Sequence, residues 1–164
     1  MQSKSVNLLI AALILTTALA VPAAAQKLVP FNGAMQGHET DTPQGGPPPT
    51  TLLADGSVRG IATLVGQFSL TYTLTVNLAD GTATGSAQLI AANGDSIITT
   101  IVGSSEPSGT PGVLSVTEIN TVTGGTGRFA GATGSFTTMR LVNVATGLTS
   151  GSFHGMITSP GATH

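Results

Sequence analysis

The sequence alternates between apolar and polar residues over most of its length, which is the pattern of half-buried β-strands. In the clearest stretch, residues 67–77, the apolar positions are Phe68, Leu70, Tyr72, Leu74 and Val76. The positions between them carry Thr, Ser, Gln and Asn. Because successive side chains of a strand point to opposite faces, one face of this strand is predicted to be buried and the other to carry hydroxyl groups.

Short turn motifs separate the strand-like segments. The triplet Ala-Asp/Asn-Gly occurs at residues 54–56, 79–81 and 92–94, and Asp-Gly and Asn-Gly are typical of hairpin turns. Segments 40–50 and 106–112 are rich in proline and glycine and are predicted to be loops. Strands are predicted over 31–38, 57–64, 67–77, 82–91, 96–102, 113–122, 135–143 and 150–157. No segment has the period of an amphipathic helix.

About eight short strands at hairpin spacing favour an all-β fold, an eight-stranded antiparallel closed β-barrel, because closure removes exposed strand edges. A two-sheet sandwich is the alternative. An outer-membrane barrel is disfavoured, since such barrels carry aromatic girdles and this chain has one tyrosine and no tryptophan.

The first 25 residues have the composition of a signal peptide. Lys4 supplies the positive charge, residues 8–20 the apolar core, and Ala23-Ala24-Ala25 the cleavage site. Residues 26–164 are then predicted to form a single domain outside the cytoplasm, in the periplasm, at the cell surface or secreted. No later segment is long and apolar enough for a transmembrane helix in the mature chain.

Composition and charge exclude several classes of function. The predicted mature chain has four Lys and Arg residues against seven Asp and Glu, a formal net charge of −3, and no basic patch. Nucleic-acid binding is therefore not expected. The absence of cysteine excludes disulfides, thiol catalysis and thiolate metal sites.

Residues 124–134 contain a formal match to a dinucleotide-binding fingerprint, Gly125-x-Gly127-x-x-Ala130. That fingerprint requires a helix directly afterwards and an acidic residue about 20 positions further on. Gly131 and Gly134 break any such helix, and Glu118 is the last acidic residue of the chain. Neither a nucleotide nor another cofactor is expected.

The same segment resembles the Gly-Gly-Thr-Gly-Lys/Arg-Phe-x-x-Ala-x-Gly signature of the allene oxide cyclase-like and dirigent-like barrel superfamily, including small exported bacterial proteins of unassigned role. Its signature residues here are Gly124, Gly125, Gly127, Arg128, Phe129, Gly131 and Gly134. The resemblance implies an eight-stranded antiparallel barrel with Phe129 plugging one end. Characterised members bind small apolar molecules in the barrel and steer cyclisation or radical coupling, but none of their pocket residues has a motif that maps onto this chain.

Three residues are the candidates for chemistry. Glu118 shares a strand face with apolar residues, and Arg140 does so on the following strand, so the two are predicted to pair across neighbouring strands. This pair is either structural or a pocket acid with its electrostatic partner. Tyr72 belongs to an apolar stripe and is predicted to be a core ring.

The histidines give a weaker signal. His38, with Glu39 and Asp41 nearby, and His154 lie near the ends of the first and last predicted strands, which a closed barrel makes neighbours. A shared site is the alternative to two separate surface histidines, and no metal is predicted. No Gly-x-Ser-x-Gly motif points to a hydrolase.

Two functions from different classes remain. The first is a non-enzymatic barrel that binds a small apolar ligand or serves as an envelope or secreted structural module, and the second is a cofactor-free cyclase or isomerase acting in the barrel cavity. A homo-oligomer is a further expectation from the superfamily. Eight-stranded barrels are just wide enough to be filled or to hold one small ligand. Small residues such as Gly85 and Ala87 would favour a cavity, and large ones would fill the interior: Leu70, Leu74, Leu89 and Ile97.

Overall fold

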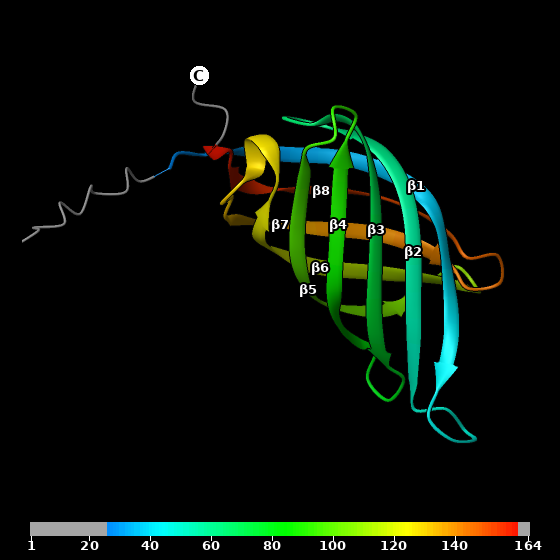
Figure 1. Ribbon diagram of the computed structural model, residues 1–164. Helices are drawn as coiled ribbons and strands as arrows, with labels where there is room; N and C mark the ends of the chain where they lie inside the picture. The colour runs from blue at the N-terminus through cyan, green and yellow to red at the C-terminus, as the bar shows by residue number, and fades with distance from the viewer. Residues whose placement is uncertain (1–25, 161–164) are drawn as a thin grey trace, which may run out of the picture.

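The computed structural model describes residues 26–160, which form a closed antiparallel barrel of eight strands in sequence order (Figure 1). The strands are β1 (Leu28–Gln44), β2 (Thr51–Ala62), β3 (Gly66–Asn77), β4 (Thr82–Ala91), β5 (Ser96–Pro107), β6 (Val113–Gly125), β7 (Gly134–Asn143) and β8 (Leu148–Thr158). The barrel closes where β1 pairs with β8 along residues 28–38 of β1. The predicted fold class is confirmed, and the sandwich alternative is excluded.

The predicted signal peptide, residues 1–25, lies outside the described residues and stays a prediction. Within residues 26–160, no helix is long and apolar enough to cross a bilayer.

Two predictions about turns are wrong. Residues 40–44 belong to β1 and pair with the start of β2, so the proline-rich loop comprises residues 45–50 rather than 40–50. The triplet at residues 54–56 lies inside β2, where Asp55 accepts a hydrogen bond from Thr73 of β3. The other two triplets form turns, as predicted.

One end of the barrel, which we call the capped end, is filled by aromatic rings. All five phenylalanines are buried: Phe31, Phe68, Phe129, Phe136 and Phe153. Phe153 is central, with ring centroids 5.0 Å from Phe31, 5.1 Å from Phe136 and 6.0 Å from Phe68. Leu89, Ile97 and Ile157 belong to the same buried cluster, so large side chains pack the capped half of the interior.

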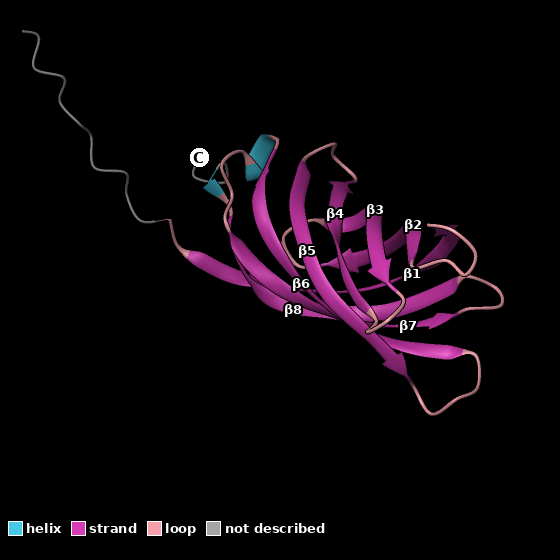
Figure 2. Ribbon diagram, turned by 90° about the horizontal axis from the view of Figure 1, so that it is seen from below, coloured by secondary structure: helices cyan, strands magenta, loops and turns pink. Residues whose placement is uncertain are grey.

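The signature segment closes this end. A single 3-10 turn, η1 (Gly127–Phe129), places Phe129 in the core with none of its surface exposed, as the resemblance implied. Figure 2 shows η1 at one end of the barrel, beside the end of β8. This short turn is not the helix that a dinucleotide fingerprint requires.

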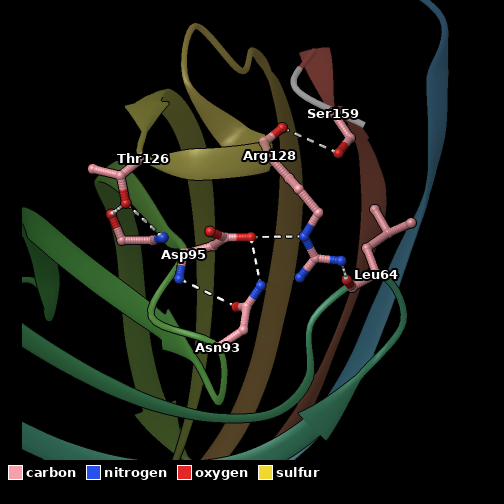
Figure 3. Close-up of polar contacts among 7 residues, drawn as sticks. Leu64, Asn93, Asp95, Thr126, Arg128 and Ser159 are labelled. Atoms are coloured by element: carbon pink, nitrogen blue, oxygen red, sulfur yellow. Dashed lines mark hydrogen bonds and ion pairs between the residues drawn. The ribbon is translucent and has the colours of Figure 1, made fainter. Parts of the chain in front are cut away.

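Arg128 holds the cap to the rest of the barrel (Figure 3). Its Nε donates a hydrogen bond of 2.7 Å to Asp95 in the β4–β5 turn, and Nη1 donates to the carbonyl oxygen of Leu64 at 3.1 Å. Gly127 has a φ of +58°, and a Cβ there would overlap the Asp95 carboxylate. Glycine at this position is therefore required by both the backbone and the ion pair.

Candidate functional site

The opposite end, which we call the cavity end, lies beside loops 45–50 and 108–112 and holds a buried polar cluster. Its members come from five strands and all point inward: Glu39 (β1), Tyr72 (β3), Glu118 (β6), Arg140 (β7) and Thr149 (β8). Each strand supplies its residue through the same period-two alternation that supplies the phenylalanines at the capped end.

Arg140 is the centre of this cluster. Its Nε and Nη2 donate to Glu118 Oε1 at 3.1 and 2.8 Å. Its Nη1 lies 2.8 Å from Glu39 Oε2 and donates to Thr149 Oγ1 at 3.2 Å. The predicted pairing of Glu118 with Arg140 across neighbouring strands is confirmed.

Tyr72 connects the cluster to β3. Its hydroxyl donates a 2.7 Å hydrogen bond to Glu39 Oε2, and its ring lies 4.8 Å from the Arg140 guanidinium carbon. Gly56 on β2 makes room for this ring, because a Cβ there would overlap it. The prediction that Tyr72 is a buried ring is confirmed, and its hydroxyl has a partner.

Burial and charge set the protonation states. Burial alone would lower the pKa of Arg140, but the charge of Glu118 and its hydrogen bonds raise it above the usual value, so the guanidinium stays charged. Burial raises the pKa of Tyr72 well above its usual value, despite the opposing charge of Arg140. The phenol is therefore a hydrogen-bond donor at neutral pH and a poor base.

A small cavity of about 50 Å³ lies above the cluster, toward the loops. Its walls are mainly aliphatic: Leu52, Ala54, Leu74, Val76, Ala83, Leu114, Val116 and Val142. Its charged lining residues are Glu39, Asp41 and Arg140. Glu118 and Tyr72 do not line it and reach it only through Arg140 and Glu39.

Asp41 differs from the other carboxylates. It is exposed at the rim of the cavity, and in residues 26–160 its side chain has no hydrogen-bond or ion-pair partner. Partial burial at this rim raises the pKa of Asp41, the nearby charge of Glu39 raises it further, and Arg140 opposes the shift. Asp41 is thus an acidic group able to take up or release a proton beside an apolar cavity.

Sequence reasoning placed Glu39 and Asp41 only as neighbours of His38 and did not assign them to the Glu118–Arg140 cluster. The signal for Glu39 was its spacing from Phe31 and Met35, which puts all three on the inward face of β1. Glycines occupy the inward positions between them, which weakens the apolar stripe.

The structure does not bring the two histidines together. His38 pairs with Leu148 of β8, whereas His154 pairs with Asn32 of β1, so they are six register positions apart on the outer face. That separation is roughly 20 Å at the usual rise per residue. Among residues 26–160, no group of three or more His, Cys, Asp or Glu side chains is arranged to hold a metal ion.

Comparison with protein-family models, with curated proteins and with solved structures gave no match.

Proposed function

We propose that the protein is an exported binding protein that accepts part of a small, largely apolar molecule at the cavity end of the barrel. The observation that carries this proposal is a buried, hydrogen-bonded network around Arg140 that forms the floor of an aliphatic cavity. Ligand sites in proteins combine mostly apolar walls with a few fixed polar groups in this way.

The size of the cavity limits what enters it. A cavity needs about 10–15 Å³ on this measure to hold one water molecule, so a cavity of about 50 Å³ has room for a group of a few heavy atoms, such as the end of a ligand. The body of the ligand would then rest on the partly exposed aliphatic residues at the mouth, Leu52, Val76 and Leu114. The resemblance to the allene oxide cyclase-like and dirigent-like superfamily also favours a small apolar ligand, by analogy only.

The hydrogen bonds of Glu118, Arg140 and Tyr72 favour a binding role for these residues over a catalytic one. Oε1 of Glu118 accepts two hydrogen bonds from Arg140, and the Tyr72 hydroxyl is committed to Glu39. In residues 26–160, no buried side-chain nitrogen or oxygen lacks a hydrogen-bond partner. The network is therefore preorganised and can hold a ligand group without rearranging.

A cofactor-free cyclase or isomerase is the second candidate, and Asp41 is the observation that favours it. A carboxyl with a raised pKa at the rim of an apolar cavity is suited to general acid–base catalysis. In this version Asp41 transfers the proton, and Arg140 and Glu39 orient the substrate. Conversion of a bound molecule by the natural protein, abolished in Asp41→Asn while binding persists, would favour this candidate.

Native mass spectrometry of the protein purified from its own host tests the binding proposal. Ala83 is buried on the cavity wall, so Ala83→Leu fills the cavity, whereas Ala34→Leu makes the same change on the outer face of β1. We expect a co-purifying small molecule in the natural protein and in Ala34→Leu, and its loss from Ala83→Leu. An empty natural protein, or a ligand retained by Ala83→Leu, would contradict the proposal.

A further inference from the structure

We infer that the ligand of this cavity carries a primary ammonium head group, which enters between Glu39 and Asp41. This inference rests on the proposed function and adds the chemical class of the ligand.

The charged groups at this site do not balance. Glu39, Glu118 and Asp41 bring three carboxyl groups to one guanidinium, that of Arg140. Ionised, these groups leave a surplus of negative charge at a cavity whose walls are aliphatic. A charge that is taken out of water is costly unless it is paired, so a cation in the cavity gains more there than in solvent. Among residues 26–160, Arg140 is the only basic residue that lines the cavity, so no other side chain there supplies that cation.

Arg140 has few hydrogen-bond donors left for a ligand. A guanidinium has five N–H groups, and Arg140 directs four contacts to Glu118, Glu39 and Thr149. A ligand carboxylate would therefore find at most one free donor and would face Glu39 and Asp41. An ammonium has three donors and no acceptor, and it finds acceptor oxygens on both of these residues.

The size and walls of the cavity also suit an ammonium head group on a hydrocarbon. The cavity of about 50 Å³ has room for a small head group such as an aminomethyl group. The aliphatic side chains above the floor, Leu74, Val76 and Val142 among them, suit the hydrocarbon that follows the nitrogen. The site therefore fits an alkylamine or arylalkylamine with a terminal primary amine.

Isothermal titration with matched probes tests the head group. The probes share one apolar body and differ at its end: phenethylamine, 2-phenylethanol and phenylacetate, with hexylamine, hexanol and hexanoate as a second series. We expect each amine to bind at least about tenfold more tightly than its alcohol, the difference between charge-assisted and neutral hydrogen bonds, and the carboxylates not to bind.

Asp41→Asn supplies the matched variant, because it keeps the shape of an exposed side chain and removes its charge. We expect this variant to lose most of the preference of amine over alcohol, while Asp55→Asn on the outer face of β2 keeps it. An alcohol or a carboxylate that binds as tightly as the amine would overturn the head-group inference and leave the binding proposal standing. Failure of all six probes, together with an empty protein from the host, would overturn both.

Discussion

The two ends of this barrel are built from the same eight strands and the same alternation, yet they differ in what the inward positions carry. The capped end holds all five phenylalanines, and its rings contact one another at centroid distances of 5.0 to 6.0 Å. The cavity end holds one ring, Tyr72, and a buried ion network around Arg140. At the capped end the aromatic rings pack closely against one another. At the cavity end the charged groups are held at hydrogen-bonding distances, and the cavity of about 50 Å³ lies beside them. The same fold thus has one end packed with rings and, at the other, the proposed binding site.

Among variants that distinguish the two ends, we expect Arg140→Met to lower the free energy of unfolding the most. This change leaves Glu39 and Glu118 buried with no positive partner, and removing one member of a buried ion pair costs about 3–5 kcal/mol. We expect a loss of that order in the free energy of unfolding, measured by urea denaturation.

The control combines Arg140→Met with Glu39→Gln and Glu118→Gln. We expect most of the stability to return, because no unpaired charge remains. A single variant that costs less than about 1 kcal/mol would mean that the network behaves as a solvated surface pair.

A smaller effect is expected from Gly56→Ala, which brings a Cβ into the Tyr72 ring. Overpacking of this kind costs about 1–3 kcal/mol, and moving the ring breaks its hydrogen bond to Glu39. Both unfolding stability and probe binding should fall. Gly46→Ala, where the new Cβ meets no atom within 4 Å, should change neither, and equal behaviour of the two variants would refute the packing role of Gly56.

At the capped end, Phe153→Leu should cost stability without changing ligand binding. The variant loses three ring contacts, each worth about 0.5–1.5 kcal/mol, and leucine recovers part of the packing, so we expect a loss of about 1–2 kcal/mol. Leu141→Ala on the outer face is the control, with an effect within about 0.5 kcal/mol. Weaker probe binding in Phe153→Leu would show that the two ends are not independent.

The smallest expected effect is on the pH dependence of stability, through the ion pair of Arg128 and Asp95 at the capped end. The hydrogen bond from Arg128 lowers the pKa of Asp95 below its usual value of 3.8. A lowered carboxyl pKa stabilises the fold above the unfolded value, and this contribution is lost as the pH falls through the folded value. Asp95→Asn should therefore unfold with a weaker dependence on pH below about 4, measured by thermal denaturation across that range. An Asp95→Asn variant with the same dependence on pH as the natural protein would contradict this role of the ion pair.

Period-two alternation was enough to predict eight strands and to place Glu118 and Arg140 on the apolar faces of theirs, because both depend on local sequence. It did not decide which face of each strand points inward. Glu39 was not placed in the cluster, since Gly33 and Gly37 interrupt the apolar stripe that would have marked its face. Those glycines, like Gly56, are required by rings and backbone on neighbouring strands, as Phe153 beside Gly33 illustrates. The packing of the Tyr72 ring against Gly56 also explains why residues 54–56, which were predicted to form a turn, lie in β2.

The most direct test of the account is a methyl NMR titration of the natural protein with phenethylamine. We expect shift changes at the methyl groups of the cavity end, Leu74, Val76 and Val142. We expect none at the buried methyl groups of the capped end, Leu89, Ile97 and Ile157. Changes confined to the outer face, at Val102 or Ile119, or spread over both ends would contradict it.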